Sequence, residues 1–519
     1  ISGYRRLLGI ALNFRWLIVL VALGVAGLSY WLFGQIKSEL SPTEDRGTIV
    51  AIISGPEGAT IGYTDAYARR IEPLLKAIPE VARYYVVAGF PTVSSGIAFT
   101  RLVPWGERKR SQQQIVAELQ PKMFTAAPGV LAFPINPASL GQSPRSKPIE
   151  FVILTSAPYS ELQKMADAVM AEARNNPNLL NLDIDLKLEK PELRVNIDRD
   201  KAADVGADIA TIGRTLETML GSRQVTRFKR EGRQYDVIVQ VADEDRRTPD
   251  DLNEIYVRGR NGEMVQLSNL VRVEESVAPR ELNHFQQLRS ATISASLAPG
   301  YTIGEALSYL DQAASRVLPA NAQTDYAGVS REFRTSSTDL YITFLLALLF
   351  IYLVLAAQFE SFIDPFIIML TVPLSMTGAL AALKLSGGTL NVYSQIGLVT
   401  LVGLITKHGI LLVEFSNQLR RRGMETRAAV IEAAGLRLRP ILMTKGAMVL
   451  GAVPLAMARG AGAESRQQIG WVIVGGLLLG TLLTLFVIPT AYTLLARRHS
   501  GPVEVEEAPA TTPAAASGD

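Results

Sequence analysis

The sequence predicts a membrane protein with six transmembrane α-helices and a large α+β region outside the membrane. Three observations predict this class: six long apolar segments, about 300 mixed and charged residues between the first and second of them, and strand and helix patterns within that region. Of the 519 residues, 48% are hydrophobic and only 19% are charged. A soluble core would not need apolar runs of this length, so a soluble enzyme is disfavoured.

The first apolar segment, residues 16–33, is uncharged and just long enough to cross a hydrocarbon core of about 30 Å as a helix. We expect a spanning helix and not a signal peptide, whose apolar region is shorter and ends in small residues at a cleavage site. Five more spans are expected in the last third of the chain: 341–357, 365–385, 392–415, 440–458 and 469–495.

Basic residues in the short connections predict the orientation, because cytoplasmic connections carry an excess of lysine and arginine. One side has Arg5, Arg6, Arg15, Arg420, Arg421, Arg422, Arg427, Arg437, Arg439, Arg497 and Arg498, and the other has Lys384, Arg459 and Arg466. We therefore expect both termini in the cytoplasm and the large loop in the periplasm of a Gram-negative cell.

The loop is expected to contain two similar halves of the split βαβ type, which suggests two ferredoxin-like modules. The first half has predicted strands at 48–54, 83–88, 96–102 and 130–134, and helices at 63–78 and 112–123. The second has strands at 149–155, 182–188, 192–197 and 291–296, and helices at 160–175 and 209–220. A further helix at 303–317 and a strand at 324–329 complete it.

An insertion follows the helix that ends near Leu220, and it contains a hairpin signal. Residues 223–229 and 235–241 flank Glu231 and Gly232, a pair suited to a tight turn. A projecting hairpin indicates a docking arm for assembly, although a solvated surface hairpin would give the same pattern. The expected domains are 1–34 (first span), 35–147, 148–220 with 274–335 (the two modules), 221–273 (the insertion), 336–498 (five spans) and a disordered tail, 499–519.

Lys407 is the ionisable residue that most needs an explanation. It lies about 12 Å from the cytoplasmic end of its predicted span, and neighbouring glycines indicate a closely packed helix and disfavour a snorkelling lysine. Glu414 is two turns away, and no other predicted span contains Asp or Glu. The carboxylate that a buried ammonium group requires must therefore come from another chain or from a missing part of this one. The first residue, Ile1, likewise indicates a piece of a longer polypeptide.

Three further polar residues lie near the cytoplasmic end of the fifth span. Arg437 and Thr444 are seven residues apart and share a helix face. A positive-inside anchor is the alternative for Arg437, and hydrogen bonding to its own helix is the alternative for Thr444. For Lys445, we expect the side chain to snorkel toward the membrane surface.

Composition and motifs exclude several classes of function. The formal net charge of +3 gives no reason to expect nucleic acid as a partner. There is no cysteine, and the only histidines are His284, His408 and His499, so no metal site is expected. The sequence has no phosphate-binding GxxxxGK[ST] loop and no nucleophile elbow, which argues against an enzyme.

Three motifs resemble the C-terminal half of the resistance-nodulation-division (RND) multidrug efflux transporters, specifically the hydrophobe/amphiphile efflux family. They are SPTEDRG at 41–47, VGLITKHGILLVEF at 402–415 and RLRPILMT at 437–444. The resemblance extends from the first span to Arg498. It implies that the six spans are the last six of twelve, and that aspartates of an N-terminal half pair with Lys407 in a proton relay that Arg437 and Thr444 join.

The resemblance also implies roles for the loop. The two modules would form a periplasmic porter domain, and the insertion with its hairpin would form a docking domain that builds a trimer. Phe90, Phe99, Ile149 and Phe151 match substrate-binding positions, with ordinary core packing as the alternative for the aromatic residues. The segment 89–96 is shorter than the family's switch loop and has Pro91 in it.

The expected function is therefore half of a proton-driven antiporter in the bacterial inner membrane. It would export amphiphilic drugs or other hydrophobic compounds through a periplasmic adaptor protein and an outer-membrane channel, with the proton gradient as energy source and no cofactor. This chain alone would not couple protons, since two copies would bring two lysines and no aspartate. The alternatives are a non-transporting receptor or assembly scaffold, and an RND exporter of metals or lipids.

Overall fold

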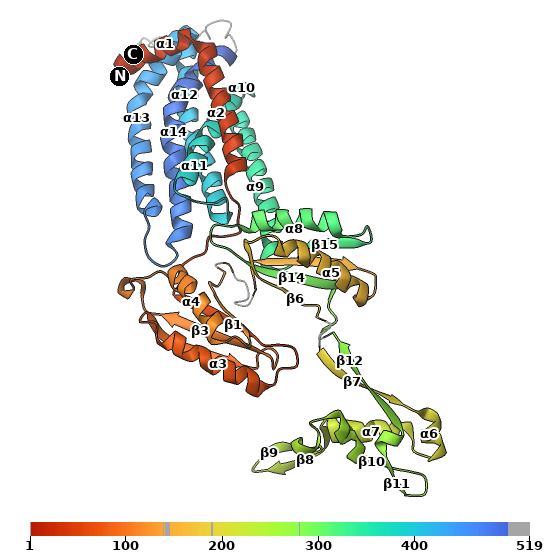
Figure 1. Cartoon of the computed structure of the whole chain (residues 1–519). Coiled ribbons are helices and arrows are strands. Elements are labelled where there is room, and N and C mark those ends of the chain that lie inside the picture. The colour runs from red at the N-terminus through yellow and green to blue at the C-terminus, as the bar shows by residue number, and fades with distance from the viewer. Residues whose placement is uncertain (1, 139, 141–145, 188–189, 280, 497–519) are drawn as a thin grey trace, which may run out of the picture. The chain divides into compact units, whose positions relative to one another are not determined.

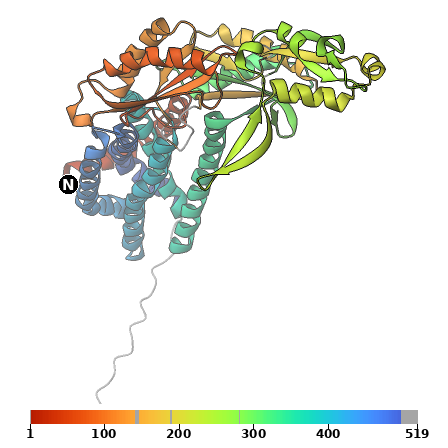
Figure 2. The same cartoon turned by 90° about the horizontal axis from the view of Figure 1, so that it is seen from below.

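Six helices of the described chain are long and apolar enough to span a membrane (Figures 1 and 2). The computed structural model describes residues 2–138, 140, 146–187, 190–279 and 281–496. The six spans are α2 (Arg15–Gln35), α9 (Gly328–Phe359), α10 and α11 (together Ile363–Leu385), α12 (Val392–Arg421), α13 (Thr426–Ala456) and α14 (Ala463–Leu495). The predicted number of spans is confirmed. The predicted disordered tail lies outside the described residues.

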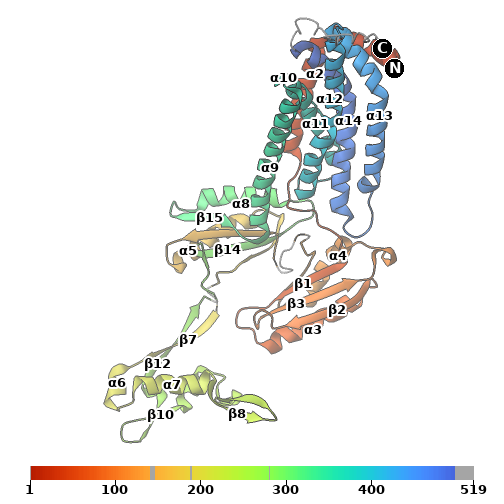
Figure 3. The same cartoon turned by 180° about the vertical axis from the view of Figure 1, so that it is seen from behind.

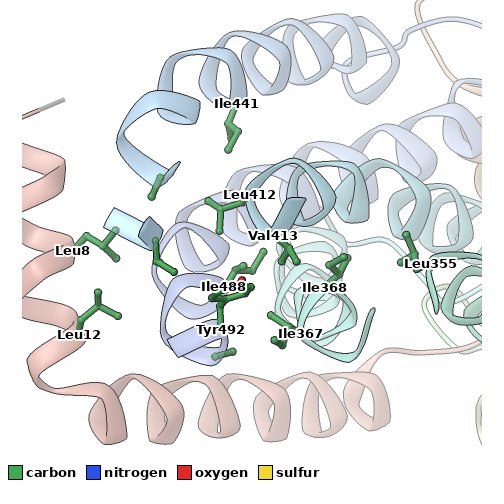
Figure 4. Packing of buried hydrophobic residues seen from close by; sticks show 13 residues of the cluster. Leu8, Leu12, Leu355, Ile367, Ile368, Leu412, Val413, Ile441, Ile488 and Tyr492 are labelled. Carbon is green, nitrogen blue, oxygen red and sulfur yellow. The ribbon is translucent and has the colours of Figure 1, made fainter. Parts of the chain in front are cut away.

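A short helix that the sequence analysis did not predict, α1 (Ser2–Asn13), precedes the first span. It buries Leu8 and Leu12 in a cluster with residues of α12, α13 and α14 (Figure 4). The Tyr4 hydroxyl donates a hydrogen bond of 2.7 Å to the carbonyl of Leu485, and Arg5 forms an ion pair of 2.8 Å with Glu432. These contacts hold α1 against the same end of the bundle at which α14 ends.

Glycines allow α14 to approach its neighbours closely. A Cβ atom on Gly475 would lie 2.6 Å from the carbonyl oxygen of Gly378 in α11. A Cβ atom on Gly476 would lie 2.2 Å from the Leu401 side chain of α12. Any larger residue would force these helices apart, so the small residues fix α14 against both α11 and α12.

The first module has the βαββαβ order that the sequence predicts (Figure 3). Its elements are β1 (Thr48–Ser54), α3 (Ile61–Lys76), β2 (Val81–Ala88), β3 (Ser95–Leu102), α4 (Gln112–Ala126) and β4 (Leu131–Ile135). The antiparallel sheet has the order β2-β3-β1-β4. Ile53 of the sheet, Ile71 of α3 and Met123 of α4 share one buried core, so both helices cover the same face.

The second module repeats this arrangement with elements that are far apart in sequence. They are β5 (Ile149–Thr155), α5 (Tyr159–Arg174), β6 (Leu179–Ile184), β14 (Leu288–Leu297), α8 (Ile303–Val317) and β15 (Ala322–Tyr326). The strand order β6-β14-β5-β15 matches that of the first module, and the two-residue strand β13 (His284–Phe285) also pairs with β14.

Two elements that we assigned to the second module belong elsewhere. The predicted strand 192–197 is part of β7 (Lys190–Ile197), which pairs with β12 (Val271–Ala278), and the predicted helix 209–220 is α7 (Ile209–Leu220). Both lie in a compact inserted unit that comprises Pro56–Ala59 and Asp185–Asn283, a larger insertion than the predicted 221–273. The apolar residues of α7 and α8 have similar helical spacing, so this spacing does not show which of the two helices belongs to the second module. The pairing of the strands shows that it is α8.

The inserted unit has its own hydrophobic core, in which Ile212, Leu252, Val257 and Leu267 are buried. Its other elements are α6 (Arg199–Asp204), β10 (Tyr256–Arg258) and β11 (Met264–Gln266). The predicted hairpin is confirmed: β8 (Arg223–Arg230) pairs with β9 (Arg233–Val239). Glu231 and Gly232 form the turn with φ angles of 52° and 78°, the conformation that such two-residue turns require.

The SPTEDRG segment joins the helix bundle to the first module. Asp45 is fully buried and accepts hydrogen bonds from Arg108 Nη1, at 2.8 and 3.1 Å, and from the backbone amide of Gln112 at 2.8 Å, at the start of α4. The neighbouring carboxylate of Glu44 accepts a hydrogen bond from the hydroxyl of Ser465, at the start of α14. Two adjacent acidic residues therefore connect the first turn of α14 with the first turn of α4.

Replacing Asp45 with alanine should destabilise the protein by about 3 to 5 kcal/mol, because Arg108 would remain buried without its counter-charge. Thermal unfolding of the purified protein in detergent measures this loss. Asp65→Ala is the matched control, since Asp65 pairs with Arg69 on the surface and its removal should change little. Equal unfolding temperatures for the two variants would contradict the role of Asp45.

Candidate functional site

Lys407 lies on a face of α12 that the rest of the described chain leaves uncovered. Ile396, Thr400, Gly403 and Lys407 are all exposed, and their spacing of four, three and four residues places them on one helix face. Lys407 makes no hydrogen bond or ion pair with any residue that the structure describes. A stripe containing a lysine and a threonine is unsuited to lipid, so this face requires a polar neighbour.

The acidic residues nearest in sequence do not reach Lys407. Glu414 accepts a hydrogen bond of 3.0 Å from Gln418, further along the same helix. Asp364, in the first turn of α10, accepts one of 2.9 Å from Asn417, ten residues and about 15 Å of helix beyond Lys407. No acidic residue that the structure describes therefore provides a counter-charge for Lys407.

Thr444 of α13 contacts α12 beside Lys407, whereas Arg437 of α13 contacts α12 about two turns closer to the end of that helix. His408 Nε2 and Thr444 Oγ1 are 3.0 Å apart, while the Arg437 guanidinium lies 4.5 Å from the ring centre of Phe415. Both contacts fit one antiparallel register of α12 and α13, because they are seven positions apart on each helix. Thr444 thus meets the residue that follows Lys407, and Arg437 lies about two turns nearer the helix end.

The expectation that Lys445 snorkels is wrong. Its side chain is only 4% exposed, and Nζ has no hydrogen-bond partner among the described residues. A buried Nζ atom is incompatible with a side chain that extends to the membrane surface. Whether a lysine side chain is buried depends on the rotation of its helix about the helix axis. The distance of the lysine from the helix end does not determine this rotation.

Glycines on the uncovered helix faces leave room for further helices. At Gly403 of α12 and at Gly446 and Gly451 of α13, no other helix or loop that the structure describes comes within 4 Å of the place where a Cβ would stand. Small residues at such positions allow another helix to approach the backbone closely.

The four predicted substrate-binding residues fall into two separate groups. Phe90 and Phe99 belong to the first module and are 56% and 36% exposed. Ile149 and Phe151 are fully buried in β5, where the Phe151 ring packs edge to face against Tyr326 at 6.0 Å. In this conformation only the two residues of the first module present an accessible surface.

Tyr85 is a candidate that sequence analysis missed. It pairs with Phe99 across β2 and β3, and it is 67% exposed on the sheet face that α3 and α4 do not cover. Strand pairing alone brings the two aromatic residues together, because 13 intervening residues separate them in sequence. They form an open aromatic surface on this sheet.

A cavity of about 690 Å³ borders both modules, and its walls are mainly apolar. None of the four predicted pocket residues lines it. Its walls come from the segments 37–43, 134–138 and 296–303, with contributions from Val116, Leu140, Pro148, Leu180, Val329 and Thr389 among others.

Glu39 is an ionisable residue in the wall of this cavity. Burial raises the pKa of its carboxyl group above the ordinary value, and a hydrogen bond from the Thr389 hydroxyl only partly opposes this effect. Its carboxylate therefore meets a less favourable environment in the folded protein than in water.

Comparison with known proteins identifies the family. Residues 1–496 match the family model described as the AcrB/AcrD/AcrF family. The chain belongs to the AcrB/AcrD/AcrF family. This match covers all six spans and both modules, and it confirms the resemblance to RND efflux transporters.

Three curated relatives illustrate the match within this family. An uncharacterized transporter of Haemophilus influenzae is 38% identical over 479 residues, which are 90% of this chain and 46% of the relative. The toluene efflux pump membrane transporter TtgB of Pseudomonas putida is 33% identical over 506 residues, 94% of this chain and 47% of the relative. The multidrug resistance protein MdtF of Escherichia coli O157:H7 is 30% identical over 489 residues, 92% and 47% respectively. The chain thus spans about half the length of the curated relatives it matches.

The raised pKa of Glu39 predicts a pH-dependent penalty on stability. Because the folded state holds the proton more tightly than the unfolded state, the penalty is absent in acid and grows as pH rises from the unfolded toward the folded pKa. Glu39→Gln should therefore unfold at a higher temperature than the unchanged protein near neutral pH, and the difference should vanish in acid.

Glu305→Gln provides a control of opposite sign. Burial works against the Glu305 carboxylate, but hydrogen bonds from Thr302 and the positive charge of Lys37 together outweigh it and leave its pKa below the ordinary value. This variant should lose stability near neutral pH, and the loss should shrink as pH falls. A Glu39→Gln difference that is independent of pH would contradict the assignment.

Proposed function

We propose that this chain is half of a proton-driven transporter that exports amphiphilic drugs or other hydrophobic compounds. It contributes the basic side of a proton relay, and an N-terminal half contributes the intramembrane carboxylates. The observation that carries this proposal is Lys407, which lies on an uncovered face of α12 without a counter-charge. Family membership supports it, since the matched relatives are about twice as long as this chain.

The relay works through a change in charge. Protonation of the carboxylates weakens their attraction to Lys407, and α12 moves to a different position against its neighbours. Thr444 and Arg437 hold α13 to α12 at two levels, through His408 and Phe415.

A path of direct contacts supports transmission of this movement. Helix α12 packs against α14, where Gly476 meets Leu401. The first turn of α14 meets Glu44 through Ser465, and the adjacent Asp45 holds the first turn of α4. A displacement of α14 is thereby passed to the first module, which carries Phe99 and Tyr85.

Apolar contacts suit the proposed substrates. Burial of apolar area is non-directional, so an aromatic surface and an apolar cavity tolerate many ligands. The cavity between the modules provides a route of entry, and the open aromatic surface provides a binding face. The name of the toluene efflux pump TtgB, a relative of this chain, is consistent with hydrophobic cargo.

The same proposal includes the assembly and its location. The transporter lies in the bacterial inner membrane with both termini in the cytoplasm and the modules in the periplasm, as the distribution of arginines supports. The hairpin of β8 and β9 serves as the arm that joins a trimer. An adaptor protein and an outer-membrane channel complete the export route, and the proton gradient drives transport without a cofactor or an enzymatic step.

Lys407→Met in the complete native polypeptide should abolish export at unchanged membrane abundance, because the apolar side chain cannot attract the carboxylates. Accumulation of a fluorescent dye in pump-deficient cells measures this, with an uncoupler as a parallel treatment. Lys384→Met is the matched control. Lys384 lies over the Trp31 ring, near the end of α11 and away from the proposed relay, so its replacement should not change export. Export that persists in Lys407→Met would contradict the role of Lys407 in proton coupling.

Phe99→Ala and Tyr85→Ala should each weaken the apparent affinity for large amphiphilic substrates by about tenfold, the effect of about 1.4 kcal/mol of lost apolar burial. Concentration-dependent efflux in the same cells measures the change. Phe124→Ala, which removes an exposed aromatic residue of α4, is the control and should have no effect. Equal behaviour of all three variants would exclude the aromatic surface as a binding face.

A further inference from the structure

Two buried basic side chains lie beside the proposed relay, and neither has yet been given a part in proton binding. His408 of α12 is 3% exposed, and Lys445 of α13 is 4% exposed. Within the described part of the chain, His408 Nδ1 and Lys445 Nζ are both buried without a hydrogen-bond partner. Unpartnered nitrogens of this kind are rare in folded proteins, because each loses its hydration without compensation.

The hydrogen bonds of Thr444 indicate which nitrogen of the His408 ring carries a proton. Thr444 has one hydroxyl proton, and the carbonyl oxygens of Pro440 and Ile441 lie 2.9 and 3.1 Å from its oxygen. When the hydroxyl donates to one of these carbonyls, it accepts a hydrogen bond from His408 Nε2. The remaining nitrogen, Nδ1, then carries a lone pair that can accept a proton.

The charged side chains that act on His408 are basic, while the backbone carbonyl of Leu404, one turn earlier, can accept a hydrogen bond from the protonated ring. Among the groups that act electrostatically on His408 are Lys445 and Lys407, both basic. Three of the helices that pack against α12 have no ionisable side chain near His408. The segments without one are 467–491 of α14, 371–383 of α11 and 342–351 of α9.

The remaining neighbours of α12 and α13 place their charges further along the bundle. On α1, Arg5 lies against Gly435, ten residues from Lys445, and on α10, Asp364 binds Asn417. Arg437 lies beside Phe415, about two turns from His408. His408 contacts Thr444, the residue before Lys445, so positive charges on both side chains would repel each other in apolar surroundings, and no described carboxylate compensates them.

We propose that His408 and Lys445 form a second protonatable site of the transporter, which holds a single exchangeable proton beside Lys407. The proton binds the lone pair of Nδ1 or of Nζ when water delivers it, and it returns to water when it leaves, with no other bond formed or broken. This inference rests on the proposed function. Occupation of the site adds a positive charge next to Lys407 and so strengthens the electrostatic change that moves α12.

The test is the pH dependence of export by the complete native polypeptide, measured over the range in which histidine titrates. His408→Asn and Lys445→Met should each shift the midpoint of the pH profile by about one unit and make it less steep, because one interacting protonatable group is lost. Lys384→Met should leave the profile unchanged. Variants whose export falls by the same factor at every pH would indicate a packing role and overturn the proposal.

Stability provides an independent readout. Lys445→Met replaces an unpaired buried amine by an apolar chain of similar length, so the variant in detergent should unfold at a higher temperature, and the gain should be larger in acid. A lower unfolding temperature at every pH would contradict the proposal. If an uncoupler does not reduce export by the unchanged protein, the proposed function is wrong. If an uncoupler reduces export but both variants keep the pH profile of the unchanged protein, only the second protonatable site is wrong.

Discussion

An ammonium group in an apolar helix bundle requires a counter-charge, and this requirement governs the interpretation of the whole chain. Lys407 lies on a face of α12 that the described residues leave uncovered, and glycines on α12 and α13 leave room for another helix to approach. In our proposal, the uncovered faces are surfaces for association, and the six spans form one side of a larger bundle.

In our proposal, the proton relay lies in the helix bundle and the substrate-binding surfaces lie in the modules. In the proposed mechanism, protonation takes place among α12 and α13, while the apolar cavity and the aromatic surface belong to the modules. Close helix packing at glycines and the buried pair of Asp45 and Arg108 give a stiff connection between these regions. A stiff connection passes on a displacement that a flexible linker would absorb.

Local sequence patterns predicted what depends on local structure. Apolar length identified the six spans, and periodicity identified every strand of the first module. The boundary of the inserted unit was wrong because pairing between β7 and β12 is non-local, and α1 was missed because it is too short to span. The burial of Lys445 depends on helix rotation, which hydropathy does not report. The signal for His408 was present: it is one of three histidines and directly follows Lys407.

The most direct test of the central claim is an experimental structure of the complete native polypeptide in a lipid environment. Our account predicts a carboxylate oxygen within about 4 Å of Lys407 Nζ, contributed by a helix outside the 519 residues described by this sequence. A Lys407 side chain that faces lipid, or that pairs with Glu414 of its own helix, would contradict the account.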